Sequence, residues 1–217
     1  MKNDKLYPTV LSVKIISNVN PDLLQNLNIP ADHRSIGILT CDMDDPTYVA
    51  LDAATKAAEV QVVYAKSMYA GSANASTKLQ GEVIGILSGK TPDAVKSGMD
   101  AALTHLKQDV YFVSANEEDS IPYFAHTISR TGSYLSKVAG IKEGEPLAYL
   151  IAPPLEAIYG LDAALKAADV KLVAFYGPPS ETNFGGGLLT GTQSACKAAA
   201  TAFADAVTQI AITPKEM

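Results

Sequence analysis

The hydrophobic pattern of the chain runs through the same series of elements twice. Each half contains four short apolar or β-branched runs with the length of strands, and Ala-rich or amphipathic stretches with helical spacing lie between and after them. The predicted strands are residues 10–16, 35–40, 60–64 and 83–87 in the first half and 124–128, 147–152, 170–175 and 187–190 in the second. This order predicts an α+β protein in which each half is one sheet covered by two helices.

A direct repeat of ten residues indicates that the two halves are copies. LDAATKAAEV at 51–60 and LDAALKAADV at 161–170 agree at eight of ten positions, and weaker similarities keep the same order on both sides. We therefore expect two domains, residues 1–116 and 117–217, with a longer polar connection at 67–80 in the first copy. Thr91 is the expected N-cap of the second helix of that copy, with Pro92 at the first helical position.

The amino-acid composition indicates how the core is packed and argues against nucleic acid and membranes as partners. The chain has 32 Ala among 217 residues, five Phe and no Trp, so its core has to close through near approach of small side chains. Hydrophobic residues make up 47% and charged residues 18%, which excludes a disordered chain. The net charge of −6 and the lack of a basic cluster argue against nucleic acid and against an anionic membrane as partners.

The residue types that usually carry catalysis or bind metals are sparse. Cys41 and Cys196 have no C-x-x-C spacing, and we expect buried free thiols in a reducing cytosol. His33, His105 and His126 have no His or Cys within five residues, which favours structural roles over metal binding. We expect no catalytic residue, cofactor or metal. With no apolar leader at the N-terminus and no run of roughly 18 apolar residues, cytoplasmic residence is expected.

One acidic segment has more charge than the fold requires. Asp42-Met-Asp-Asp45-Pro46 follows a predicted strand and precedes a helix, and capping by Asp45 with Pro46 at the first helical position explains only one of its carboxylates. The corresponding corner of the second half, residues 152–156, contains a single acid. Crowded carboxylates attract a small cation or an organic amine, and the sequence leaves open whether a metal also binds.

The repeat also carries a family resemblance. The decapeptide, followed by a strand, a polar loop and a Gly-bounded apolar strand, resembles the signature of bacterial microcompartment shell domains, here present twice. Further motifs extend the similarity to shell proteins of ethanolamine-utilization microcompartments over essentially the whole chain: residues 35–39, 44–48, 129–136, 152–156 and 179–183. The resemblance implies two tandem, circularly permuted, ferredoxin-like shell domains, with three chains forming a pseudohexameric disc that tiles with other shell proteins.

The resemblance further implies a gated central pore and ethanolamine bound beside smaller pores, where the ligand favours the closed state. Carried over by position, the ethanolamine-binding residues are Asp44, Asp45, Glu82, Phe112, Thr182, Asn183 and Phe184. The pore or gate loops contain Tyr69, Gly71, Ser72, Asn74, Gly177, Gly185, Gly186 and Gly187. Lys56 and Lys166 of the repeated decapeptide are expected at the edge of the tile, against the neighbouring disc.

Three hypotheses follow from the residues and the resemblance together. The first is a structural shell trimer, located in the shell of a cytoplasmic microcompartment, with a gated pore for metabolites or cofactors. The second is a soluble sensor of two α+β modules that binds an amine at the acidic segment without assembling. The third, a carboxylate-based enzyme, ranks last because no acid–base pair occurs with a recognisable nucleophile.

Overall fold

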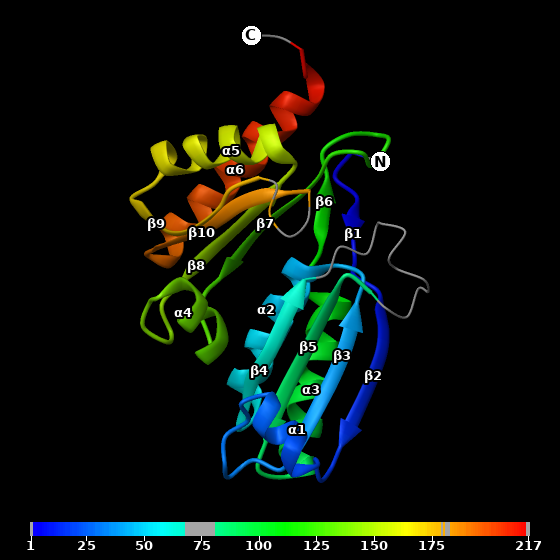
Figure 1. Ribbon diagram of the computed structural model, residues 1–217. Coiled ribbons are helices and arrows are strands. Elements are labelled where there is room, and N and C mark those ends of the chain that lie inside the picture. The colour runs from blue at the N-terminus through cyan, green and yellow to red at the C-terminus, as the bar shows by residue number, and fades with distance from the viewer. Residues whose placement is uncertain (1, 68–80, 179, 181–182, 216–217) are drawn as a thin grey trace. The chain divides into compact units, whose positions relative to one another are not determined.

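The computed structural model describes residues 2–67, 81–178, 180 and 183–215, and the chain forms two compact units (Figure 1). The N-terminal unit comprises Tyr7–Val110 and Gly132–Leu135. The C-terminal unit comprises Met1–Leu6, Tyr111–Thr131 and Ser136–Met217. Each unit therefore takes a short segment from the far side of the sequence, and the division into shell domains at residue 116 stays a prediction.

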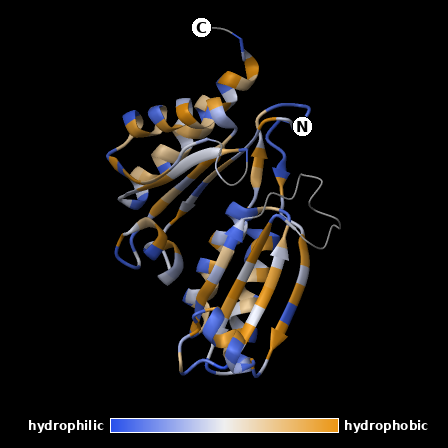
Figure 2. Cartoon of the chain, in the orientation of Figure 1, coloured by the Kyte–Doolittle hydropathy of each residue, from blue (hydrophilic) through white to orange (hydrophobic). Residues whose placement is uncertain are grey.

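The N-terminal unit is a four-stranded antiparallel sheet with helices on it. The strand order is β2-β3-β5-β4, and each strand pairs in register with its neighbour apart from two bulges. The strands are β2 (Val10–Ile16), β3 (Ser35–Cys41), β4 (Val60–Ser67) and β5 (Val83–Gly89), and the helices are α1 (Pro21–Asn26), α2 (Asp44–Ala57) and α3 (Pro92–Gln108). Figure 2 shows that apolar residues dominate the central strands of this sheet.

Small residues let two of these helices approach the sheet closely. A Cβ atom on Gly37 of β3 would lie 2.6 Å from Cγ of Met99 in α3, and one on Gly85 of β5 would lie 2.6 Å from Cδ1 of Leu51 in α2. Real Cβ atoms do not approach so closely, so the glycines set the distance between helices and sheet. The expectation that the core closes through small side chains is confirmed here.

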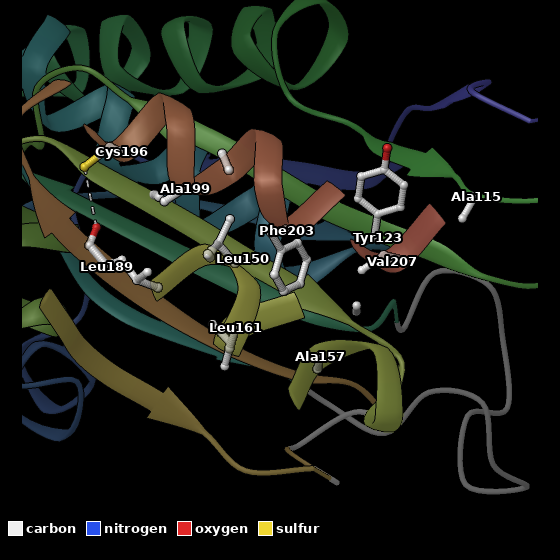
Figure 3. Packing of buried hydrophobic residues seen from close by; sticks show 14 residues of the cluster. Ala115, Tyr123, Leu150, Ala157, Leu161, Leu189, Cys196, Ala199, Phe203 and Val207 are labelled. Atoms are coloured by element: carbon white, nitrogen blue, oxygen red, sulfur yellow. Dashed lines mark hydrogen bonds between the residues drawn. The ribbon is translucent and has the colours of Figure 1, made fainter. Parts of the chain in front are cut away.

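The C-terminal unit repeats this arrangement. Its sheet order is β1-β6-β7-β8-β10-β9, in which β7-β8-β10-β9 matches β2-β3-β5-β4 strand for strand. The elements are β1 (Lys5–Leu6), β6 (Phe112–Ser114), β7 (Pro122–Ile128), β8 (Leu147–Ala152), β9 (Val170–Tyr176), β10 (Gly185–Gly191), α4 (Ser133–Ala139), α5 (Pro154–Ala167) and α6 (Gln193–Ile212). The core between the helices and the sheet is built around Phe203, Leu150 and Leu161 (Figure 3). The predicted α+β duplication is confirmed.

Two details of the predicted elements are wrong. α2 begins at Asp44, and its N-cap is Met43, which makes no side-chain capping hydrogen bond, so Asp45 already lies in the first turn. β10 begins at Gly185, so residues 185–187 pair with β8 and β9 and do not belong to the preceding loop. The N-cap of α3 is as predicted, since Thr91 Oγ1 accepts from the Ala94 amide.

The cysteines and histidines have structural surroundings. Cys41 and Cys196 are free and buried as expected, and burial raises the pKa of both thiols. His33 Nδ1 lies 2.8 Å from Ser88 Oγ, His105 pairs with an aspartate one turn on, and His126 stacks on a phenylalanine. Among the described residues, none of the helices combines the length and hydropathy of a membrane span.

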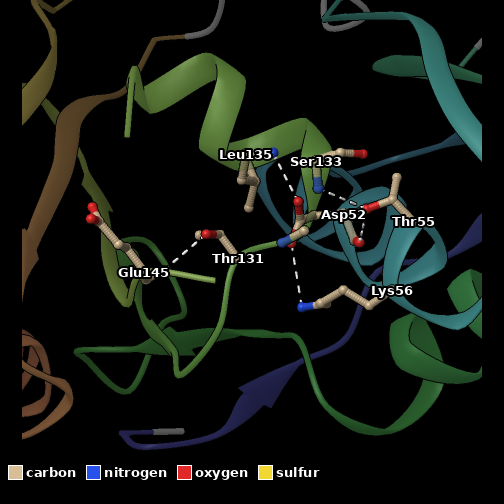
Figure 4. Close-up of polar contacts among 8 residues, drawn as sticks. Asp52, Thr55, Lys56, Thr131, Ser133, Leu135 and Glu145 are labelled. Carbon is tan, nitrogen blue, oxygen red and sulfur yellow. Dashed lines mark hydrogen bonds and ion pairs between the residues drawn. The ribbon is translucent and has the colours of Figure 1, made fainter. Parts of the chain in front are cut away.

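A buried carboxylate ties α2 to the segment Gly132–Leu135 (Figure 4). Asp52 has no exposed side-chain surface, and its two oxygens accept hydrogen bonds from the Gly132 amide at 2.7 Å and the Leu135 amide at 2.8 Å. Thr55 Oγ1 accepts from the Ser133 amide at 3.1 Å, and Lys56 Nζ lies 3.3 Å from Asp52. The charge is thus compensated by two amides at the start of α4 and by a lysine.

The equivalent aspartate in the second copy has none of these contacts to a distant segment. Asp162 occupies the same position of the decapeptide, but its side chain is 61% exposed, and among the described residues it pairs with Lys166, at 2.6 Å. Gly132 explains part of the difference, because a Cβ atom there would collide with Thr55 Oγ1 and the Asp52 backbone. Nearly identical sequence motifs therefore have different structural roles in the two copies.

We expect Asp52→Asn to lower the free energy of unfolding by about 2–3 kcal/mol, because one carboxylate oxygen becomes an NH₂ group facing a buried amide donor. Asp162→Asn is the matched control and should change the free energy by less than about 0.5 kcal/mol, since exposed i,i+4 ion pairs contribute little. Urea unfolding followed by circular dichroism measures both. Equal losses in the two variants would contradict the assignment.

Candidate functional site

Four acidic side chains gather where β3 ends and α2 and β5 begin. We call Asp42, Asp44, Asp45 and Glu82 the acidic corner. The Glu82 amide donates a hydrogen bond to the Cys41 carbonyl at 2.8 Å, which brings the start of β5 beside the end of β3. The antiparallel pairing of these two strands thus joins residues that lie 40 positions apart in sequence.

Asp44 is held by a chain of hydroxyl groups. Its Oδ2 accepts a hydrogen bond from Ser67 Oγ at 2.6 Å, and Ser67 Oγ lies 2.6 Å from the Tyr48 hydroxyl. Because Ser67 has one hydroxyl proton and gives it to the carboxylate, Tyr48 donates to Ser67. The carboxylate is therefore linked to the last described residue of β4, directly before residues 68–80.

The other two aspartates have distinct surroundings. Asp42 Oδ1 accepts from the Thr9 amide at 2.6 Å, which fixes the chain at the start of β2. Asp45 is buried in the first turn of α2, where the amides of the helix N-terminus favour a negative charge. Both carboxylates thus contribute to the fold as well as to the charge of the acidic corner.

Glu82 is the acid whose ionisation the surroundings oppose. Partial burial raises the pKa of its carboxyl group above the ordinary value, and the negative charges of Asp44 and then Asp42 raise it further. The charged form of Glu82 is therefore disfavoured until a cation offsets the local field. An ammonium group, which offers several donors and one positive charge, is suited to this position.

The aromatic part of the predicted ligand set lies in the C-terminal unit. Phe112 of β6 is buried, and its ring centroid lies 5.3 Å from that of Phe124 and 6.0 Å from that of Phe184. Asn183 is exposed before β10, and Thr182 lies outside the described residues. The structure thus brings Asp44 near Glu82 in one unit and Phe112 near Phe184 in the other, and the seven-residue set stays a prediction.

The remaining predicted residues fall into two groups. Tyr69, Gly71, Ser72 and Asn74 lie outside the described residues, whereas Gly177 follows β9 and the three glycines 185–187 lie in β10. Lys56 and Lys166 occupy the last turns of α2 and α5, each paired with the aspartate four residues before it. Neither the gate role nor the tile-edge role is tested by these positions.

Two residues that complete the acidic corner cannot be recognised from the sequence. Ser67 and Tyr48 orient Asp44, yet a serine at a strand end and a tyrosine in a helix have no distinctive sequence signal. The burial of Asp52 could not be predicted for a different reason, since its decapeptide is nearly identical to the one that contains the exposed Asp162. Asp52 and Asp162 differ in their contacts to distant parts of the chain, which the decapeptides do not specify.

Comparison with known proteins defines the class to which this duplicated α+β fold belongs. The family model of the BMC domain matches residues 35–120. The fold and the motif are thus those of bacterial microcompartment shell domains.

Full-length relatives narrow the class. The bacterial microcompartment shell protein EutL of Clostridium perfringens is 65% identical over 214 residues, 99% of each chain, and EutL of Escherichia coli K12 is 49% identical over 97% of this chain and 96% of its own. The crystal structure of the ethanolamine utilization protein EutL from Leptotrichia buccalis is 66% identical, covers 100% of both chains and superposes with a TM-score of 0.97. The chain belongs to the EutL family of bacterial microcompartment shell proteins.

We expect Glu82→Gln to stabilise the protein at pH 7 but not below pH 4. As the pH rises, a carboxyl group whose pKa is raised in the folded state loses its proton first in the unfolded chain. Glu82 therefore lowers the free energy of unfolding only above its ordinary pKa of 4.5. Urea unfolding of the variant and the wild type at both pH values measures the difference. Glu143→Gln, at an exposed loop position, is the control and should leave the midpoint nearly unchanged at both.

Proposed function

We propose that the chain is a structural tile of the ethanolamine-utilization microcompartment shell. The observation that carries this proposal is the full-length similarity to EutL shell proteins on a chain built from two copies of one unit. Assembly in the shell, within the cytoplasm, is then the main activity, and the protein acts by controlling passage rather than by catalysis.

A homotrimer is the assembly that suits a duplicated unit. Three chains under threefold symmetry present six similar units, so one disc has six similar edges and can pack into a hexagonal layer with its own kind and with other shell proteins. The lysines of the repeated decapeptide, Lys56 and Lys166, are the proposed edge contacts. Lys166 is the more available of the two, since its side chain is 74% exposed against 36% for Lys56.

Ethanolamine is the proposed ligand of the acidic corner. Its ammonium group would lie among Asp44, Asp45 and Glu82, where the repulsion that raises the Glu82 pKa would become attraction to the ligand. The predicted contribution of the C-terminal unit is Phe112, Thr182, Asn183 and Phe184. The chemistry suits a small organic cation, because a ligand with one positive charge can satisfy carboxylates that repel each other.

The acidic corner also offers a physical route from ligand to gate. Residues 68–80 begin directly after Ser67, which donates to Asp44, and end just before Glu82, whose amide bonds to Cys41. A ligand on these carboxylates thus acts at both attachment points of the first proposed gate loop. If the ligand binds the closed arrangement more tightly than the open one, it shifts the gate toward closure by that difference in affinity.

We expect purified protein at high concentration to form regular hexagonal sheets or discs in negative-stain electron microscopy. Lys166→Glu should abolish the sheets and leave the folded protein intact, because an exposed ion pair of this kind contributes only about 0.3–0.5 kcal/mol. Lys197→Glu, the same change at an exposed position on α6, is the control and should retain the sheets. A wild-type protein that stays monomeric under all conditions contradicts the shell proposal.

Isothermal titration calorimetry tests the ligand. We expect ethanolamine to bind the wild type and to bind at least tenfold more weakly to Asp44→Asn, since a charge-assisted hydrogen bond contributes about 1.5–3 kcal/mol. Asp169→Asn, at an exposed position after α5, is the control and should bind normally. Binding by a protein that never forms sheets would favour the amine sensor over the shell tile.

A further inference from the structure

A stripe of polar side chains runs along one face of α2. Asp44, Tyr48, Asp52 and Thr55 follow one another at intervals of four, four and three residues, which places them on one side of the helix. We call these four residues the α2 stripe. One end of the stripe is Asp44 of the acidic corner. The other end, Asp52 and Thr55, accepts hydrogen bonds from the amides of the segment Gly132–Leu135 (Figure 4).

Tyr48 lies between the two ends of the α2 stripe and has a contact toward each. Its hydroxyl oxygen lies 2.6 Å from Ser67 Oγ, which donates to Asp44 Oδ2 at 2.6 Å. Its ring centroid lies 6.2 Å from that of Tyr134, in the segment 132–135. A phenol that is held both at its ring and at its hydroxyl has few rotamers left, so it presents its proton to Ser67 from one direction.

The hydrogen bonds to Asp44 leave a defined part of its carboxylate for a ligand. A carboxylate has about four acceptor positions, two on each oxygen. Among the described residues, Oδ1 accepts from the Asp45 amide at 2.9 Å and Oδ2 accepts from Ser67, so each oxygen retains an acceptor position. Because the two bonds fix the plane of the carboxylate, these positions point in fixed directions, and a ligand with N–H donors depends on direction as well as on charge.

The second copy indicates that the fold does not need this chain of hydroxyl groups. A shift of 110 residues converts Asp44 into Pro154, Tyr48 into Ile158 and Ser67 into Gly177. The four main strands of the two units nevertheless have the same order. The hydroxyl groups thus accompany the acidic corner rather than the architecture, which supports a role in what the carboxylates bind.

We propose that Tyr48 is a positioning residue of the amine site and that its packing on Tyr134 couples this site to the segment 132–135. The inference rests on the proposed binding of ethanolamine at the acidic corner. Tyr48 donates to Ser67, Ser67 donates to Asp44, and the oriented carboxylate accepts from the ammonium group. Coupling is reciprocal, so the bound ligand also favours the packing of the segment 132–135 on α2.

Isothermal titration calorimetry with ethanolamine tests the positioning role. We expect Tyr48→Phe and Ser67→Ala each to weaken binding about two- to tenfold, the range for one lost neutral hydrogen bond. Ser67→Thr keeps the hydroxyl group and should bind like the wild type. Tyr64→Phe, at an exposed position of the strand that contains Ser67, is the control and should also bind like the wild type.

Double-mutant cycles show whether Tyr48 acts through Ser67. A residue that acts only through a neighbour loses its effect when the neighbour is removed, so Tyr48→Phe should weaken binding no further once Ser67→Ala is present. Tyr134→Ala should weaken binding by itself and have no effect in the Tyr48→Phe background. Additive losses in either pair, or wild-type affinity in Tyr48→Phe, overturn the inference and leave ethanolamine binding standing. A wild type that binds no ethanolamine overturns both.

Amide hydrogen exchange tests the coupling from the other side. Saturating ethanolamine should slow exchange of the amides of the segment 132–135 that bond to α2 by about two- to tenfold, the factor that reciprocity requires. Tyr48→Phe at saturating ligand should show no such slowing. Residues 21–26 of α1 are the internal control and should exchange alike with and without ligand. No protection in the wild type, or equal protection in both proteins, overturns the coupling.

Discussion

The buried carboxylate of Asp52 is the interaction on which the packing of residues 132–135 against α2 depends. A charge without solvent contact is tolerated only when several donors compensate it, and here two backbone amides and a lysine do so. Those amides belong to a segment 80 residues further along the chain. The N-terminal unit is therefore complete only when residues 132–135 have joined it.

Gene duplication of a small α+β unit usually gives two copies with the same surface, yet these copies have diverged at one helix face. The decapeptide remained nearly constant while its surroundings changed, from a covered polar face on α2 to an exposed apolar face on α5. A polar face with buried hydrogen bonds demands one specific partner segment.

The acidic corner shows how a structural element can also hold potential for binding. The amides of the first turn of α2 stabilise the charge of Asp45, and Asp42 accepts a hydrogen bond from the Thr9 amide. These two acids therefore contribute to the fold. Glu82 has the opposite character, because burial and its acidic neighbours disfavour its charge. A bound cation would offset this unfavourable charge, which lies directly before β5.

The amino-acid sequence by itself determined the duplication, the eight longer strands and the helices between them, the buried thiols and the family, because periodicity, small-residue spacing and direct repeats are local properties of the chain. It did not indicate the short strands β1 and β6, which have too few residues to show a period. It also pointed to the acidic segment 42–46, since the excess of charge there is visible without a structure. Tertiary structure alone decided that Asp52 is buried and Asp162 exposed, that Ser67 and Tyr48 orient Asp44, and that residues 185–187 pair as a strand. Each of these depends on which distant backbone groups come into hydrogen-bonding distance, and two nearly identical decapeptides cannot encode that difference locally.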